Sequence, residues 1–576
     1  MTGPVQDVAT MGLALQRFAW PDYLVFVAML VLCAVIGVYF GYFAPGQHDE
    51  DEYLMGGRKM QVLPISLSLV ASYISGITLL GLPTEVYVFG VQPFYAFGGM
   101  LMWLAVFNWA VLPIFHDLQL MTLYQYLQMR FDRRVRLFGS VFFTISLLTW
   151  LPIVIYVPAL AFNQVTGINV HIVTPAVCIV CVFYTCVGGM KAVVWTDVVQ
   201  TVSMLLCIFL VAIRGTFNVG GASVVFQRNL ESGRIEPPDF RLDPFVRLTF
   251  WGYTLGHFFS QNVSCGLSQA MMQRYLALPD IGKARRAAAF FVLGCLLLFA
   301  VCTYCGLLIF ASYHDCDPVT TKLARAKDQV LPLLVMDTLG MYPGLPGLFV
   351  AGVFSAALSS LSTGLNSMAA VVVEDFWRPL SRTPPSEASV NMVMRLVVVV
   401  FGVVCVGLVF VVERLGVVLQ LSGSLNSISA GPVLAVFVGG AFMPWVNATG
   451  CLAGAGAGLS FMAWLVLSAQ HAIARGDLLF PEKPVSVQGC TYSFNATTPH
   501  AVHEPQLPMW LFRVSYHWYP VIGVVVSLVV ATAVSLLCRS EAAVDRRLFS
   551  PAIRRFLHPP PKAATDFAKG IKESTL

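Results

Sequence analysis

A short polar segment of the sequence has the residue types and the spacing of a cation site. Within the serine-rich stretch 354–367, Ala356, Ser359 and Ser360 are spaced i, i+3 and i+4. That spacing places the Ala356 carbonyl and both hydroxyls on one face of a helix. Sodium is a hard cation that takes several oxygen ligands, so this face predicts part of a sodium site. The alternative is a serine zipper that packs two helices against each other.

A second segment, 64–84, has a middle rich in serine, threonine and glycine. Such residues let a helix break and expose its carbonyls, and a broken helix is tolerated in a membrane where it lines a cavity. Freed carbonyls and half-helix ends are how many secondary transporters hold a cation near the bilayer midplane. Close helix packing through small residues is the alternative, and this segment alone does not decide between the two.

Other kinds of chemistry have no matching motif. No glycine-rich loop ends in Lys-Ser or Lys-Thr, so ATP is not expected to drive this protein. His171, His257 and His314 stand alone without metal-ligand spacing, and no Gly-x-Ser-x-Gly motif occurs in a credible context. The sequence therefore predicts no enzyme activity and no cofactor.

The elements that must position these residues are membrane-spanning helices. Of the 576 residues, 57% are hydrophobic and only 11% are charged, and the apolar residues fall in long unbroken runs. Runs of this length cross the ~30 Å hydrocarbon core as helices, and the short alternating segments of a barrel are absent. We therefore predict an all-α polytopic membrane protein with about thirteen spans. The predicted spans are 21–43, 61–90, 93–115, 137–166, 171–189, 193–214, 249–273, 287–312, 343–373, 391–413, 416–442, 447–469 and 518–538.

Basic residues predict the orientation of these spans. The segment 130–136 is strongly positive, and the same side of a thirteen-span topology carries Lys283, Arg285, Arg286, Arg378, Arg382, Arg539, Arg546 and Arg547. Positive loops face the cytoplasm. We therefore expect a plasma-membrane protein with its amino terminus (1–20) outside and its tail (541–576) inside. These loops also explain the formal net charge of +5, so no nucleic-acid partner is expected.

The longest hydrophilic loop, 470–517, falls on the outer side of this topology. It contains the sequon Asn495-Ala496-Thr497, which makes Asn495 a candidate glycosylation site. Cys316 and Cys490 are the only cysteines in the predicted outer loops, where they can form a disulfide or remain free thiols.

Several blocks of the sequence resemble the sodium/solute symporter family. They are Gly188-Gly189-Met190-Lys191-Ala192-Val193-Val194-Trp195-Thr196-Asp197-Val198-Val199-Gln200, Gln273-Arg274-Tyr275-Leu276, and the segments 327–332, 335–340 and 343–352. The resemblance runs from about residue 21 to about residue 540, and is greatest to the branch that holds the sodium-coupled monocarboxylate, multivitamin and iodide transporters. It implies the inverted-repeat fold of the leucine-transporter type, with repeats at 61–214 and 249–442, one helix before them and further helices after them.

The resemblance also implies a sodium site. Ala71, Ile74 and Ala356 match the positions whose carbonyls bind the shared sodium ion, and Ser359 and Ser360 match the two hydroxyl ligands.

Three further positions match residues involved in coupling. Asp197 matches a carboxylate near the inner end of a span that is linked to sodium release or coupling, and a helix-end cap is the alternative. Ser75 and Thr78 match positions that help to form a second ion or substrate site in this branch.

The sequence departs from the sugar-carrying members. Where those members have an asparagine and a histidine in the second span, this chain has Tyr73 and Thr78, and their tyrosine-tryptophan pair falls on Ser264 and Cys265. The candidate lining of the solute cavity is Tyr73, Ser75, Thr78, Trp150, Tyr156, Gln261, Gln420, Ser424 and Asn426. These hydroxyl and amide groups suit an anion or a neutral polar solute, since helix amino-termini at a break can bind a carboxylate without arginine. Ordinary packing is the alternative for each aromatic.

The resulting hypothesis is a sodium-coupled symporter that imports a small solute, above all an organic anion such as a monocarboxylate or a vitamin. The alternatives are a transporter of iodide or another anion, a sodium-independent facilitator, and a solute sensor on the same fold. The terminal Ser574-Thr575-Leu576 can add as a strand to a PDZ domain, which is the expected protein partner.

Overall fold

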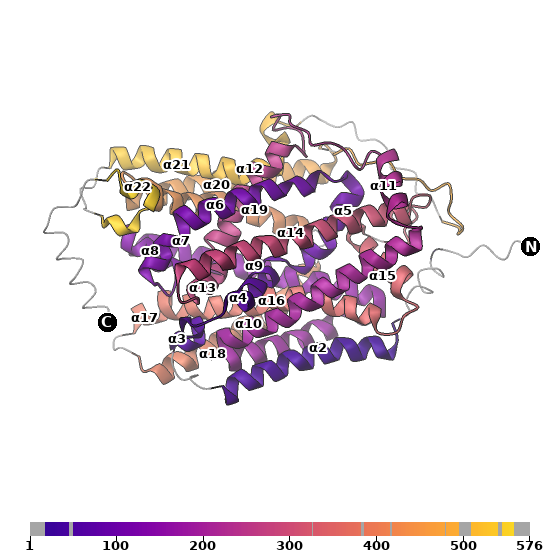
Figure 1. Ribbon diagram of the computed structural model, residues 1–576. Coiled ribbons are helices and arrows are strands. Elements are labelled where there is room, and N and C mark those ends of the chain that lie inside the picture. Colours follow the sequence, from indigo (N-terminus) through magenta and orange to yellow (C-terminus); the bar gives the residue numbers. More distant parts are fainter. Residues whose placement is uncertain are drawn as a thin grey trace, which may run out of the picture.

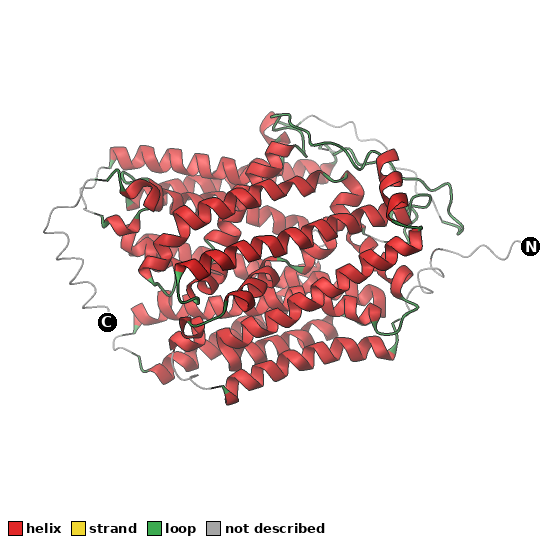
Figure 2. Ribbon diagram, viewed as in Figure 1, coloured by secondary structure: helices red, strands yellow, loops and turns green. Residues whose placement is uncertain are grey.

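Long helices that run side by side make up the protein in this computed structural model (Figure 1). The structure describes residues 8, 18–44, 50–324, 326–381, 385–414, 418–478, 480–494, 508–538 and 544–557, and in this part it contains helices and loops but no strand (Figure 2). The side chains of 50 and 413–425 lie outside the described part. The predictions for Gln420, Ser424, Asn495 and Ser574–Leu576 therefore also fall outside it.

Nine helical segments in the described chain are long and apolar enough to cross a membrane, and one bent pair of helices makes a tenth span. The nine are α2 (Trp20–Val38, extended by a π-turn to Phe43), α6 (Ala96–Val106) with α7 (Leu112–Leu118), α9 (Arg133–Thr166), α10 (Val170–Val219), α14 (Ile281–Ser312), α16 (Leu345–Val371) with α17 (Arg378–Leu380), α18 (Glu387–Arg414), α20 (Ala448–Arg475) and α21 (Tyr519–Leu537). The bent pair is α4 (Val62–Tyr73) and α5 (Gly76–Phe89). The all-α membrane class is confirmed.

Two more of the expected spans correspond to interrupted or shorter apolar helices. They are α12 (Phe250–Gln261) with the π-turn Asn262–Gly266 and α13 (Gln269–Leu276), and α19 (Val418–Phe442). Short helices connect the spans: α3 (Glu50–Met55), α8 (Leu123–Arg130), α11 (Ala222–Glu231), α15 (Val330–Leu339) and α22 (Pro551–Arg554). The number of thirteen spans remains a prediction.

Helix α10 is interrupted at Gly189, where φ is 54° and ψ is −152°. Glycine is required there because the backbone is left-handed and a Cβ would lie 2.8 Å from the Tyr53 carbonyl oxygen. The Tyr53 hydroxyl donates to the carbonyls of Thr185 and Cys186, both at 3.2 Å, so the kink has a partner for the groups that it frees. The kink at Gly189 falls on the last residue of the span that the sequence predicts at 171–189, just before the span predicted at 193–214.

Helix α16 passes through the centre of the molecule. In its most apolar window 94% of the residues are buried, compared with 22% for α2 at the margin. A helix enclosed on all sides meets other helices rather than lipid, so its polar residues need partners on those helices. The serine face of α16 is therefore inside the protein.

Arg130 closes the end of α19 at one end of the bundle. Its Nε donates to the Gly440 carbonyl at 2.9 Å, and its Nη2 donates to the carbonyls of Met443 and Val446 at 3.0 and 3.1 Å. A helix leaves its last carbonyls without partners, and a cation is favoured there. The described basic loops gather at this end, near the labels α8, α17 and α22 in Figure 1.

A disulfide joins two loops at the opposite end. Cys316 follows α14, Cys490 follows α20, and their Cα atoms are 4.9 Å apart. Beside it the Asp317 amide donates to the Ser486 carbonyl at 2.8 Å, and the Lys483 amide donates to the Val88 carbonyl at 2.9 Å. The loop after α20 is therefore attached both to the loop after α14 and to the end of α5.

Arg234, in the loop before α12, holds the same end of α5. Its side chain is fully buried, with Nε donating to the Tyr87 carbonyl at 2.8 Å and Nη1 to the Pro484 carbonyl at 3.1 Å. The guanidinium lies 3.5 Å from the centre of the Phe310 ring. Burial lowers the pKa of Arg234 to about 10, so it remains a cation at neutral pH.

The disulfide is expected to stabilise the folded protein. Replacing Cys316 or Cys490 with serine should lower the free energy of unfolding by about 2–4 kcal/mol, because the crosslink no longer restricts the unfolded chain. Thermal unfolding of the purified protein measures the effect. The exposed free cysteine Cys538 is the matched control, and Cys538→Ser should unfold like the wild type. Equal unfolding temperatures for all of these variants would contradict this prediction.

Candidate functional site

The candidate site is built around the break between α4 and α5, where the chain bends by 62°. Ile74 leaves the helical conformation with φ −80° and ψ 108°, and Ser75 then caps the start of α5. Gly76 follows because the chain passes close to α9, where a Cβ would lie 2.7 Å from Pro158 Cγ. The last carbonyls of α4 therefore lack helical partners and are available to a ligand.

Helix α16 places its serine face against this break. Ser72 Oγ, in the last turn of α4, lies 3.3 Å from Ser359 Oγ and 2.9 Å from Thr363 Oγ1. Ala356 and Ser359 are fully buried, and Ser360 Oγ donates to the Ala356 carbonyl at 3.1 Å. The structure therefore brings together the two segments from which the sequence predicts a sodium site.

The carbonyl residues of the predicted site, Ala71 and Ile74, are at most 1% exposed. All the oxygens that these two segments offer are neutral carbonyls and hydroxyls. A monovalent cation can replace its water shell with such dipoles, and an enclosed position strengthens each of those interactions. This chemistry fits sodium better than a divalent ion, which prefers carboxylate ligands.

A buried ion pair lies next to the serine face. Asp197 of α10 and Arg274 of α13 are 0% and 1% exposed, and Arg274 Nη2 lies 2.9 Å from Asp197 Oδ2. Ser68 Oγ also donates to this oxygen, at 2.6 Å. Asp197 therefore pairs with side chains instead of capping a helix end. Its other oxygen, Oδ1, is buried without a hydrogen-bond partner in the described chain.

Hydrogen bonds connect the ion pair to the predicted sodium site. Arg274 donates to Thr363 Oγ1, Thr363 Oγ1 contacts Ser72 Oγ, and Ser72 Oγ contacts Ser359 Oγ. Ser359 is therefore linked to the partners of Asp197 through groups in direct contact.

Ser75 and Thr78 lie at the start of α5. Ser75 Oγ accepts from the Thr78 amide at 3.4 Å and lies 3.4 Å from Thr78 Oγ1, so these two side chains cap α5. Their role in a second ion or substrate site remains a prediction.

The structure joins two residues of the predicted solute cavity directly. Gln261, at the end of α12, donates from Nε2 to the hydroxyl of Tyr73, the last residue of α4. Trp150 and Tyr156 are partly buried on α9, and Asn426 is exposed on α19. Among the described candidates, Tyr73 and Gln261 thus form a pair that joins two helix breaks, the one between α4 and α5 and the one between α12 and α13.

The chain is similar to several known proteins. A model of the sodium:solute symporter family matches residues 53–458. The chain belongs to the sodium:solute symporter family. Human sodium-coupled monocarboxylate transporter 1 is 36% identical over 532 residues, which cover 89% of this chain and 87% of that protein. The human sodium/iodide cotransporter is 39% identical over 452 residues, covering 78% of this chain and 70% of that protein.

A solved structure shows the same fold. A Na⁺-coupled sialic acid symporter, in a substrate-bound outward-open state, aligns with a TM-score of 0.74 at 24% identity, over 90% of this chain and 98% of that one. This likeness confirms the expected class of fold for the symporter, an inverted repeat of the leucine-transporter type. The boundaries of the two repeats remain predictions.

Sequence reasoning did not single out Arg274, Ser68, Ser72 or Thr363 of this symporter as site residues. Arg274 belongs to one of the blocks that resemble the family, yet nothing in its neighbourhood indicates burial or a carboxylate partner. The partner, Asp197, is 77 positions away in the sequence. A basic residue within two turns of a glycine- and serine-containing interruption of an apolar span is the signal that could have found it.

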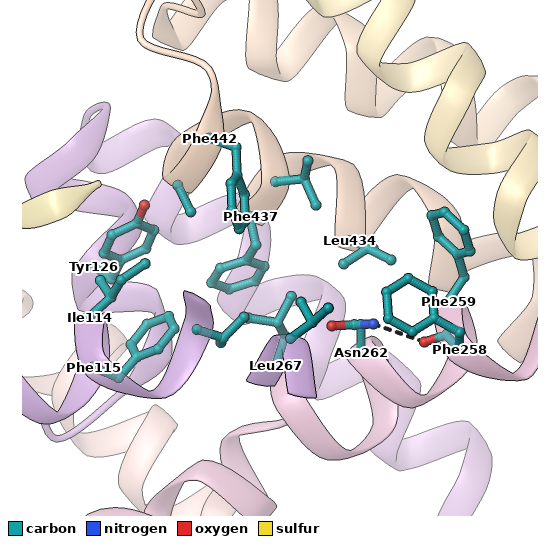
Figure 3. Close-up of a pocket in the computed structure, with 14 residues that line it drawn as sticks. Ile114, Phe115, Tyr126, Phe258, Phe259, Asn262, Leu267, Leu434, Phe437 and Phe442 are labelled. Atoms are coloured by element: carbon teal, nitrogen blue, oxygen red, sulfur yellow. Dashed lines mark hydrogen bonds between the residues drawn. The ribbon is translucent and has the colours of Figure 1, made fainter. Parts of the chain in front are cut away.

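A separate apolar cavity of about 190 Å³ lies between α6–α7, α12 and α19 (Figure 3). Ile114, Phe115, Leu434 and Phe437 line it, together with Tyr126 and Asn262. The Asn262 amide donates to its own helix, to the Phe258 carbonyl at 2.8 Å, as the dashed line in Figure 3 marks. None of the described residues of the predicted solute cavity lines this space, and its surface suits apolar groups rather than an anion.

Proposed function

We propose that this symporter couples the entry of sodium to the import of a small organic anion, of the monocarboxylate or vitamin class, across the plasma membrane. The observation that carries the proposal is the contact between the broken end of α4 and the serine face of α16, with the buried Asp197–Arg274 pair directly attached. The names of the relatives, transporters of monocarboxylates, iodide and multivitamins that depend on sodium, support it.

Sodium would bind between the carbonyls of Ala71, Ile74 and Ala356 and the hydroxyls of Ser359 and Ser360. It would link α4 to α16 and hold the break in the shape that receives the solute. Entry of each positive charge across a potential of 100 mV contributes roughly 2.3 kcal/mol, so more than one sodium per anion would add inward drive. We place the amino terminus outside and the basic end of the bundle in the cytoplasm.

We propose that Asp197 serves coupling through its paired position. Arg274 balances the charge of Asp197, and Ser68 donates a hydrogen bond to it. The contacts from Arg274 through Thr363 and Ser72 to Ser359 connect the pair to the proposed sodium site. Loss of sodium would release Ser359 and Ser72, and this change would reach Arg274 through Thr363.

Uptake of labelled solutes into cells that express the chain tests the proposal, with sodium replaced by choline. The panel contains lactate, butyrate, nicotinate, biotin, pantothenate, iodide and glucose. We expect sodium-dependent uptake of at least one organic anion and none of glucose, since the lining departs from that of the sugar carriers. Uptake of iodide alone would favour the second candidate, an inorganic-anion symporter, which the 39% identity to the sodium/iodide cotransporter supports. Uptake that is indifferent to sodium would make the protein a facilitator.

A further inference from the structure

A histidine outside the predicted cavity belongs to the cluster that joins the two helix breaks. His257 lies one turn before Gln261 on α12, and its Nε2 is 2.7 Å from Gln261 Nε2. The same amide nitrogen donates to the Tyr73 hydroxyl, while the Cys265 thiol donates to Gln261 Oε1 at 2.8 Å. Three side chains, from α4, α12 and the π-turn after it, thus surround the Gln261 amide group.

Both N–H donors of the Gln261 amide already have partners in this cluster. An amide NH₂ group has two protons, and here one goes to Tyr73 and the other to His257. His257 Nε2 must therefore act as an acceptor, so the imidazole is neutral and carries its proton on Nδ1. Gln261 has no donor left for an anionic solute in this arrangement.

Two protons of this cluster have no partner within it: the O–H of Tyr73 and the Nδ1–H of His257. The Tyr73 oxygen accepts from Gln261, and among the described residues its O–H has no hydrogen-bond partner, so it can donate to another group. Gln261 and Cys265 are at most 1% exposed, whereas Tyr73 and His257 are only partly buried. The ring of Tyr73 is held edge-on against Phe291 at 5.7 Å between centroids, which limits its rotation. Tyr73 is also adjacent to Ile74, a carbonyl of the proposed sodium site.

We propose that His257 is a positioning residue: it holds the Gln261 amide so that the amide binds the Tyr73 oxygen, and the Tyr73 O–H donates to the carboxylate of the solute. The inference rests on the proposed function and adds to it a determinant of specificity. It assigns recognition of the anion to a phenol beside the sodium site, and it makes Gln261 a link between the two broken helices.

Kinetics of sodium-driven uptake, with the monocarboxylate that the panel identifies, test the proposal. Tyr73→Phe removes the donor and should raise KM about tenfold while Vmax per molecule at the surface stays close to that of the wild type. His257→Leu removes the acceptor, lets the amide turn away from Tyr73, and should raise KM almost as much. His257→Gln keeps an acceptor at the same reach and should stay within about a factor of two of the wild type.

The double variant separates positioning from simple structural support. Because both single variants remove the same hydrogen bond, Tyr73→Phe/His257→Leu should raise KM no further than Tyr73→Phe alone. The proposal would be overturned if His257→Leu had the KM of the wild type, or if the effects on KM of the two single variants multiplied in the double variant. It would also be overturned if His257→Gln raised KM as much as His257→Leu does.

Failure of the proposed function is distinguished by the wild type itself. If the wild type shows no sodium-driven uptake of any anion, symport fails, and the test moves to binding. Stabilisation of the purified protein by nicotinate or butyrate, measured by thermal unfolding, must then be lost in Tyr73→Phe and in His257→Leu, and kept in His257→Gln. Stabilisation that survives in both of the first two variants would refute the assignment.

Discussion

Replacement of both Ser359 and Ser360 with alanine is expected to abolish sodium-dependent uptake. The two hydroxyls are the side-chain oxygens of the proposed sodium site. Both are buried on α16, and Ser359 contacts Ser72 of α4. Losing one interaction with a charged group costs about 1.5–3 kcal/mol, so losing two should raise the sodium concentration for half-maximal uptake about a hundredfold or more. At physiological sodium, uptake by cells that express the variant should therefore equal the uptake measured with sodium replaced by choline.

Ser367→Ala is the matched control for this prediction. Ser367 lies on the same helix, is 1% exposed, and donates its hydroxyl to the Thr363 carbonyl at 2.8 Å. Removing the Ser367 hydroxyl should lower stability about as much as removing the hydroxyl of Ser359 or Ser360. It should leave the sodium dependence of uptake close to that of the wild type. If the double serine variant reaches the surface and retains a normal sodium activation curve, the ion binds elsewhere and the proposed site is wrong.

The sequence predicts the helices of this protein well because burial in a membrane demands long apolar runs. The run at 518–538 corresponds to α21, and the glycine- and serine-rich interruption in 64–84 corresponds to the break at Ile74. The division of α10 at Gly189 also falls on the last residue of one expected span, just before the next. What hydropathy cannot supply is the number of crossings made by interrupted helices such as α12 and α13, since their apolar stretches are short.

The candidate site is less accessible to sequence reasoning, because its contacts join distant segments. The spacing of Ala356, Ser359 and Ser360 indicates one helix face, but only the fold places that face against Ser72. No metal-ligand pattern surrounds His257 in the sequence. Yet its i+4 partner is Gln261, and that spacing on an apolar helix is itself a signal of a hydrogen-bonded pair.

Arg274→Met is expected to destabilise the folded protein more than Asp197→Asn does. It would leave the Asp197 carboxylate buried without its cation, and breaking a buried pair in this way costs about 3–5 kcal/mol. We expect little of this variant at the cell surface and a lower unfolding temperature for the purified protein. Asp197→Asn should lower the unfolding temperature less, because the oxygen of the Asn amide can still accept hydrogen bonds from Arg274 and Ser68. The loss that remains comes from the guanidinium, which no longer has a counter-charge.

The double variant Asp197→Leu/Arg274→Met separates folding from coupling. Replacing both members of a buried pair by apolar groups of similar size is often neutral for stability, so surface expression should return toward the wild-type level. Sodium-driven uptake should not return, because the link from Thr363 and Ser72 to a charged pair is gone. Flux measured per molecule at the surface, with and without sodium, decides the matter. Restored uptake with a normal sodium dependence would make Asp197–Arg274 a structural pair and would remove it from the coupling mechanism, whereas a folded protein without sodium-driven uptake would assign the pair to coupling.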